Sequence, residues 1–344
     1  MPITRNPNDY GGTIEHTSAV NEIPNQSGFI NSKNIFDARY TDQEAILFDR
    51  IESTTTLLAD TDRRVGDAEY GKDRDVTTFS LPLGYMKKKD NVTKQDFLSK
   101  RRAGSADEAD TLANVISEKL VDLRQSVDQT HEYMKLQAIK GITKTPSGTT
   151  LADMFTEFGE TQVSVDFLLG TAGTNVRAKC AEVKDEMIKN LKTGGIIGGL
   201  VEVVVDRSFF DKLVSHPEVS VAYYNSLSNV QYQKDLSTYL TTGISDVFDF
   251  QGLRFVVYSH TFNLPDGTTE VAVAADTGHV IPPVAGLFKA FYGPSQRLGS
   301  VGGAEMFAYE YRDPKDMFHE LTIESAPLMY CQKPKTLIKV LSSN

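Results

Sequence analysis

Residues 104–141 read GSADEADTLANVISEKLVDLRQSVDQTHEYMKLQAIKG, with no proline and no glycine between the first and last positions. Apolar side chains recur along the stretch at helical spacing, at Ala109, Leu112, Ile116, Leu120, Leu123, Val127 and Met134. Ser105 and Glu108 form a capping box at its start, and Gly141 suits a left-handed cap at its end. At ~1.5 Å per residue the predicted helix is roughly 55 Å long, several times the usual length. Such a helix in a chain of 344 residues is typical of a strut and indicates a mechanical role.

Composition narrows the class of protein further. The net charge is −10, so bulk attraction to nucleic acid is not expected. No apolar run approaches the ~20 residues of a membrane span, and the first residues lack the apolar core of a secretion signal. With only two cysteines, Cys180 and Cys331, we expect no disulfide framework and a reducing compartment. Each cysteine is predicted to be a small core hydrophobe.

Three segments precede the long helix. Residues 1–35 are rich in Asn, Pro, Gly and Ser, which predicts an extended arm that is ordered only when something else holds it. Residues 43–61 are predicted to form a short helix followed by a turn. Val76–Met86 alternates apolar and polar residues as a strand does, and Pro82 and Gly84 confine it to an edge strand or a projecting arm.

The projecting arm is predicted to be a basic hairpin. Its tip would be Lys87–Asn91, and Val92–Leu98 would return along the first strand. Between Tyr85 and Gly104 seven basic residues face two acidic ones, so this segment carries +5 and the rest of the chain −15. A basic hairpin on an acidic protein suits contact with a neighbouring copy. The predicted intersubunit contact residues are Phe79, Leu81, Leu83, Tyr85, Lys87, Lys88, Lys89, Arg101 and Arg102.

Downstream of the long helix the pattern predicts a compact α+β region. Residues 149–158 and 160–168 are expected to form a hairpin that turns at Gly159. Residues 174–191 are expected to be a second helix, with the apolar stripe Val176, Cys180, Val183, Met187 and Leu191. A capped helix is expected at 208–215, and strands are expected at 201–206, 253–258, 269–274, 305–311, 317–324 and 337–341.

The motifs of common catalytic sites are missing from the sequence. It has no phosphate-binding loop and no nucleophile elbow, and Gly194–Gly199 is interpreted as a hinge. The six histidines show no metal-ligand spacing with the cysteines, and His319 and Glu320 would face opposite sides of a strand. Cap and surface roles explain the possible carboxylate cluster of Asp206, Asp211 and Glu218 better than catalysis does. We therefore expect no catalytic, cofactor or metal site.

The sequence resembles the major capsid protein E family of lambda-like tailed phages. The matching blocks occur in the family's order, from about residue 45 to the end. The most specific block is Leu151–Gln162, which reads LADMFTEFGETQ. The other matching blocks are Phe79–Leu83, Leu136–Gly141, Ser208–Val219, Asp249–Phe255, Val284–Phe288 and Ser325–Met329. The N-terminal 40 residues match little.

The resemblance implies the Hong Kong 97-like capsid fold, in the α+β class. It implies an N-terminal arm (1–45), a connecting segment (46–75), an extended loop (76–103) and a peripheral domain (104–199) with spine helix 104–141. An axial domain (200–335) and a C-terminal return strand (336–344) would follow.

The implied function is a major capsid protein of the virion, assembled in the host cytoplasm. Its copies would form hexamers and pentamers of an icosahedral shell around double-stranded DNA, without sequence-specific binding. The portal protein would be a partner, and scaffold and decoration proteins are further candidates. Two alternatives remain: the shell of an encapsulin-like nanocompartment, and a soluble enzyme, for which the sequence supplies no convergent polar pocket.

Overall fold

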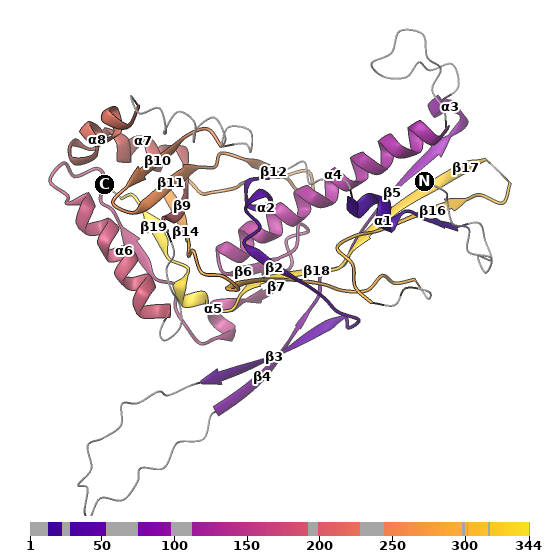
Figure 1. Cartoon of the computed structure of the whole chain (residues 1–344), viewed down its shortest axis with the longest axis horizontal. Helices are drawn as coiled ribbons and strands as arrows, with labels where there is room; N and C mark the ends of the chain where they lie inside the picture. The colour runs from indigo at the N-terminus through magenta and orange to yellow at the C-terminus, as the bar shows by residue number, and fades with distance from the viewer. Residues whose placement is uncertain are drawn as a thin grey trace, which may run out of the picture.

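The fold of the chain is mixed α and β. The computed structural model describes residues 13–22, 28–52, 75–97, 112–191, 199–227, 244–297, 300, 302–315 and 317–343. Two sheet-containing bodies lie at opposite ends of a long helix, α4 (Leu112–Ile139), and a β-hairpin projects away from both (Figure 1). The predicted capping box and the expected helical residues 104–111 lie outside the described residues.

Helix α4 is 28 residues long. Of its predicted apolar stripe, Leu120, Leu123, Val127 and Met134 are buried and Leu112 and Ile116 are partly buried, whereas Ala109 lies outside the described residues. Gly141 has a φ of +87°, so the expected left-handed termination is confirmed. Helix α4 also buries charged side chains that an apolar stripe does not predict, among them Arg124, Asp128 and Glu132.

The first half of α4 covers an antiparallel four-stranded sheet. In spatial order, the strands are β1 (Thr13–Glu15), β16 (Phe307–Arg312), β17 (Phe318–Ser325) and β5 (Met86–Thr93). Short helices α1 (Thr17–Glu22) and α3 (Lys94–Phe97) flank it. Val92, Leu321 and Ile323 pack from the sheet against Leu123 and Val127 of α4.

A six-stranded sheet forms the body at the other end. In spatial order, the strands are β10 (Val247–Phe250), β11 (Leu253–Val257), β9 (Val201–Val205), β14 (Thr277–Ile281), β19 (Lys339–Leu341) and β8 (Ser164–Asp166). Three helices accompany it: α6 (Val176–Leu191), α7 (Arg207–Ser215) and α8 (Pro217–Leu227). All five residues of the predicted α6 stripe are buried in the core under this sheet, which confirms that helix and its register.

Smaller elements join the two bodies. A three-stranded sheet orders β18 (Pro327–Cys331), β15 (Phe288–Tyr292) and β2 (Phe36–Tyr40), preceded by helix α2 (Phe29–Lys33). Two hairpins pair β6 (Ile142–Lys144) with β7 (Thr150–Asp153), and β12 (Thr261–Asn263) with β13 (Thr269–Val271). The remaining short helical elements are α5 (Met154–Glu157) and a 3₁₀ turn (Pro334–Thr336).

The expected helix within residues 43–61 is wrong. Residues Ala45–Glu52 form strand β3, which pairs antiparallel with β4 (Asp75–Pro82). Phe48 faces Phe79 across the pair and packs on Tyr330, whereas Leu47 is exposed. The apolar residues of this segment therefore belong to a strand with one face turned inward. Pairing with β4, and not a helical repeat, decides which side chains are buried.

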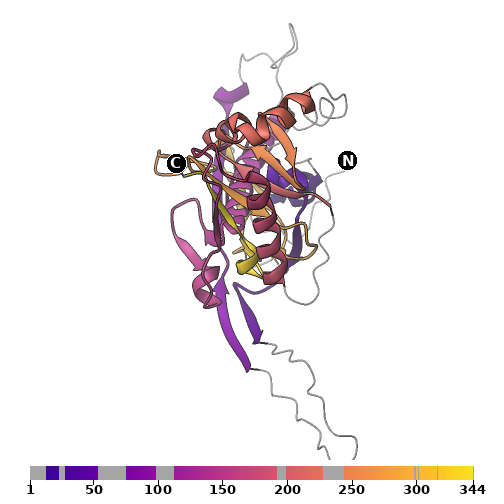
Figure 2. The same cartoon turned by 90° about the vertical axis from the view of Figure 1, so that its left-hand side faces the viewer.

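The expected return of residues 92–98 along 76–86 is also wrong. Strand β4 pairs with β3, whereas β5 pairs along its full length with β17, from Phe318 opposite Thr93 to Ser325 opposite Met86. The projecting hairpin is therefore β3–β4, as two views at right angles show (Figures 1 and 2).

The expected hairpin at Gly159 is wrong as well. Thr150–Asp153 pairs with β6, and the Asp153 side chain then accepts hydrogen bonds from the backbone of Phe155 and Thr156 at the start of α5. Strand β8 joins the six-stranded sheet instead. The strand expected over residues 149–158 therefore stops at Asp153. The Asp153 carboxylate accepts hydrogen bonds from the first N–H groups of α5, so the chain continues as a helix.

Candidate assembly surfaces

The basic segment predicted as a hairpin tip lies on β5, within the four-stranded sheet. Lys87 and Lys89 form ion pairs with acids of β17: the Nζ–O distances are 2.8 Å to Glu324 and 2.7 Å to Glu320. Lys88 points to the opposite face and donates to Ser126 Oγ of α4 at 2.7 Å. These lysines thus have partners within their own chain, and their contact with acids of another copy stays a prediction.

Glu324 is the buried member of this set. Its carboxylate also accepts a 2.6 Å hydrogen bond from Ser295 Oγ. Burial raises the pKa of the Glu324 carboxyl, but the hydrogen bonds from Lys87 and Ser295 outweigh burial and hold the pKa below its usual value. Tyr85 lies beside this carboxylate, and burial raises the pKa of its phenol.

The apolar residues predicted for the intersubunit surface have partners within the chain. Leu81 is buried in a cluster with Leu328 and Tyr330, and Phe79 and Leu83 pack against that cluster. These three predicted contact residues are therefore packed within their own subunit. Their contact with another copy stays a prediction, and Arg101 and Arg102 lie outside the described residues.

The β3–β4 hairpin combines an anchored base with a bare face. Phe48 stacks on Phe79 with ring centroids 5.6 Å apart and meets Tyr330 edge-on at 4.6 Å. Leu47, on the other face, is 69% exposed. The hairpin leaves the body in both views (Figures 1 and 2). Leu47 was not singled out in the sequence because its run was interpreted as helical.

The described part of the expected N-terminal arm packs on its own chain. Strand β1 pairs with β16, and His16 Nε2 lies 2.8 Å from Glu310 of that strand. His319 Nδ1 approaches the other oxygen of Glu310 at 2.5 Å. The hydrogen bond from His16 lowers the pKa of Glu310, and the bond from His319 adds to this against the opposing effect of burial. The expected arm is thus held, over its described residues 13–22, by strand β16 of its own chain.

Helix α8 lies at the end of the six-stranded body away from α4 (Figure 1), and it exposes apolar side chains. Val219 of α8 is buried, whereas Val221 and Tyr224 on its outer face are the most exposed large apolar side chains of the helix. Helical spacing places these two on one face. This bare apolar face was not recognised in the sequence.

The carboxylates considered as a possible catalytic cluster have structural partners. Asp206 accepts from Ser208 N and caps α7, Asp211 pairs with Arg207, and Glu218 accepts from Val176 N at the start of α6. The two cysteines are buried and unpaired, and burial raises the pKa of each thiol to about 12. Within the described ranges, no group of three or more potential metal ligands lies together.

No helix in the described part of the chain is both long and apolar enough to cross a bilayer.

Comparison with known proteins gives concordant matches. The profile of a family described as "Phage major capsid protein E" matches residues 14–342. The major capsid protein of Salmonella phage Felix O1 is 30% identical over 346 residues, covering 94% of this chain and 94% of that protein. The major capsid protein of Pseudomonas phage KPP10 is 30% identical over 330 residues, covering 92% and 93%.

Solved structures share the fold at low identity. The crystal structure of the putative capsid protein of an Escherichia coli CFT073 prophage has a TM-score of 0.63 and 12% identity, covering 96% of this chain and 99% of that one. A subunit of the mature capsid of bacteriophage PhiM1 has a TM-score of 0.52 and 14% identity, covering 100% and 92%. The predicted Hong Kong 97-like fold is confirmed.

Proposed function

The chain belongs to the phage major capsid protein E family and is a shell-forming subunit of the virion; from this premise we propose that its copies form hexamers and pentamers of an icosahedral head around double-stranded DNA. The β3–β4 hairpin is the observation that carries the proposal. A two-stranded ribbon is marginal in water by itself, and this one exposes Leu47 while its base is fixed by aromatic packing. Burial of this exposed face against a neighbouring copy would supply the stability that the hairpin lacks alone.

We assign the extended loop of the fold to the β3–β4 hairpin, and the spine helix to α4. The expected division at residue 200 separates elements that pack together, because β16 and β17 lie in the four-stranded sheet against α4, and α6 packs in the core of the six-stranded body. We therefore propose a peripheral domain built from α4 and the four-stranded sheet, and an axial domain built from the six-stranded sheet with α6, α7 and α8, in place of the bounds 104–199 and 200–335. Residues 1–45 remain the proposed N-terminal arm, and 336–344 the return strand. Intersubunit burial of apolar surface would drive assembly, and exposed charges such as Lys89 would set register and salt dependence.

We further propose that the chain has no catalytic role. Its proposed partners besides itself are the portal protein and, as further candidates, scaffold and decoration proteins. The net charge of −10 supports enclosure of DNA without sequence-specific binding, because a strongly acidic protein has little bulk affinity for phosphate.

Electron microscopy of purified full-length chain and of the parent particle tests the proposal. We expect closed shells with sixfold and fivefold capsomers, and DNA inside the parent particle. A shell that contains a cargo protein and no DNA would establish the nanocompartment alternative. A small soluble oligomer that never closes would overturn the proposal.

A further inference from the structure

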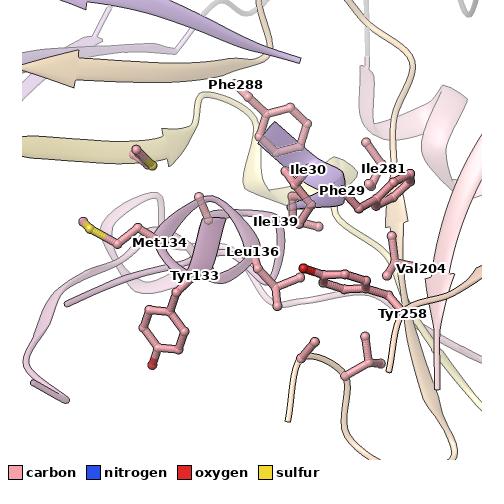
Figure 3. Close-up of a cluster of buried hydrophobic side chains, with 14 of the residues drawn as sticks. Phe29, Ile30, Tyr133, Met134, Leu136, Ile139, Val204, Tyr258, Ile281 and Phe288 are labelled. Carbon is pink, nitrogen blue, oxygen red and sulfur yellow. The ribbon is translucent and has the colours of Figure 1, made fainter. Parts of the chain in front are cut away.

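A short segment near the N-terminus lies between α4 and the six-stranded sheet. This α2 segment, Gly28–Asn34, contains helix α2. Phe29 and Ile30 are fully buried in the core between the second half of α4, the six-stranded sheet and the three-stranded sheet (Figure 3). In that view Phe29 lies beside Tyr258, and Ile30 lies between Ile139 of α4 and Phe288. The segment is thus part of the packing between two elements that come from distant parts of the chain.

On one side, polar contacts attach the α2 segment to α4. Glu132 accepts hydrogen bonds from the backbone N–H groups of Ile30 and Asn31, at 2.8 and 2.7 Å. Lys135 Nζ donates to Asn31 Oδ1 at 2.7 Å, and Asn31 Nδ2 donates to the Asp128 carbonyl at 3.0 Å. Because Glu132 is buried, loss of these donors would leave its carboxylate with fewer hydrogen bonds and no solvent to replace them, which is unfavourable.

On the other side, the α2 segment contacts the six-stranded sheet. Lys33 Nζ lies 2.5 Å from Glu202 Oε1 of β9. The Phe29 ring lies 6.0 Å from that of Tyr258, which directly follows β11, and Tyr258 donates from its hydroxyl to Glu132 at 2.9 Å. Glu132 therefore joins α4, the α2 segment and the end of β11 through one carboxylate.

Gly28 allows this close approach. Its φ of +100° is one that side-chain-bearing residues rarely adopt. A Cβ at Gly28 would overlap the carboxylate group of Glu132. Any larger residue would push the α2 segment away from α4.

We infer that the α2 segment fixes the angle between α4 and the six-stranded sheet, and thereby the curvature at which copies of the chain assemble. A ring of identical copies closes only at particular rotations between neighbours, and the curvature of a shell likewise depends on the angles between its subunits. When interface residues lie on two bodies of one subunit, the angle between those bodies contributes to that rotation. This inference rests on the proposed shell-forming assembly and adds the residues that determine shell size.

A charge-swap set tests the link to the sheet. Lys33→Glu and Glu202→Lys each place like charges together, and the double variant restores an opposite-charge pair. Both side chains are partly exposed, so the variants are expected to fold. In electron micrographs, we expect the particles of each single variant to have diameters that differ from those of wild-type particles or are mixed. We expect the double variant to recover the wild-type diameter. Wild-type diameters in both single variants would overturn the inference.

A matched glycine pair tests the link to α4. Gly28→Ala and Gly148→Ala both place alanine at a positive φ, but the space around Gly148 is open. We expect altered or mixed diameters only for Gly28→Ala, with thermal unfolding of dissociated subunits as the folding control. If both variants keep the wild-type diameter, the α2 segment does not set curvature. If the wild type itself forms no shell, the proposed function fails instead, so the two failures are distinguishable.

Discussion

Lys87 and Glu324 form an ion pair whose two members lie in very different environments. The Nζ–Oε1 distance is 2.8 Å, the Glu324 side chain is almost completely buried, and that of Lys87 is 39% exposed. The pair therefore satisfies a buried carboxylate from β17 with a cation from the outer edge of the same sheet. A surface lysine that looks available to a neighbouring copy is thus also part of the stability of its own subunit.

Replacing Lys87 with alanine should destabilise the subunit. Ser295 still donates to the Glu324 carboxylate, and solvent screens the lysine side, so we expect a loss of about 1–2 kcal/mol in the free energy of unfolding. Lys88→Ala is the matched control, because Lys88 contacts only an exposed hydroxyl among its described partners, and its effect should stay within about 0.5 kcal/mol. Denaturant titration of dissociated subunits measures both. Equal losses of unfolding free energy in the two variants would show that the Lys87–Glu324 pair contributes no more to stability than the Lys88 contact does.

Acid should weaken the attachment of β1 to β16. The pKa of Glu310 lies below its usual value because His16 and His319 hydrogen-bond the ionised carboxylate. A lowered pKa in the folded state gives stability that is complete above the unfolded value of about 4.3 and is lost as the pH falls through the folded value.

Glu310→Gln should therefore lower stability at neutral pH and flatten its pH dependence below about pH 4.3. Glu186→Gln, at a surface ion pair on α6, serves as the control. Thermal unfolding across a pH series gives the comparison. A Glu310→Gln curve parallel to the wild-type curve at all pH values would contradict the role of this carboxylate.

Substitutions on the two faces of the β3–β4 hairpin should have different effects, one on assembly and the other on the stability of the subunit. Leu47→Asp alters an exposed face, so the free energy of unfolding should change by less than about 0.5 kcal/mol while the yield of closed particles falls. Phe48→Ala removes half-buried ring contacts with Phe79 and Tyr330 and should reduce stability by about 1–3 kcal/mol. Calorimetry and particle counts in electron micrographs measure the two effects. A normal particle yield for Leu47→Asp would show that this face does not contact another copy.

The reactivity of the two cysteines should report unfolding. Cys180 lies in the core of the six-stranded body, and Cys331 lies in the core that also contains Phe29 and Ile30. Burial raises the pKa of Cys180 and of Cys331 to about 12, far above the usual value of about 8.5, so neither carries a thiolate at mildly alkaline pH. We expect a thiol-specific reagent to label neither residue in the native subunit and both in denaturant. Rapid labelling of one thiol without denaturant would reveal local opening around that residue.

Local sequence pattern was sufficient for the two longest described helices, α4 and α6. The spacing of Val176, Cys180, Val183, Met187 and Leu191 predicts α6 and its buried face, and all five side chains are buried. The apolar stripe and Gly141 likewise predict the described part of α4 and its end. In both cases the information lies within one or two turns of the residue concerned, because helical hydrogen bonds are local.

Strand partners and buried charges were not predictable in the same way. Strand β5 finds its partner β17 more than 200 positions away, so neither its basic composition nor its neighbours indicate the pairing. Glu132 is buried because the N–H groups of residues about 100 positions earlier reach its carboxylate. Read alone, a charged residue on a long helix is expected to face solvent.

The order β1-β16-β17-β5 places two strands from the first hundred residues on either side of two from the last forty. The six-stranded sheet similarly needs β19, which ends at Leu341, before β8 has a neighbour. A chain emerging from the ribosome therefore holds β1, β5 and β8 unpaired until residues 307–341 have been made, because closing such distant pairs must wait for the partner to exist. A chain that stops before these residues could not complete either sheet, and it would lack the folded bodies on which shell contacts depend.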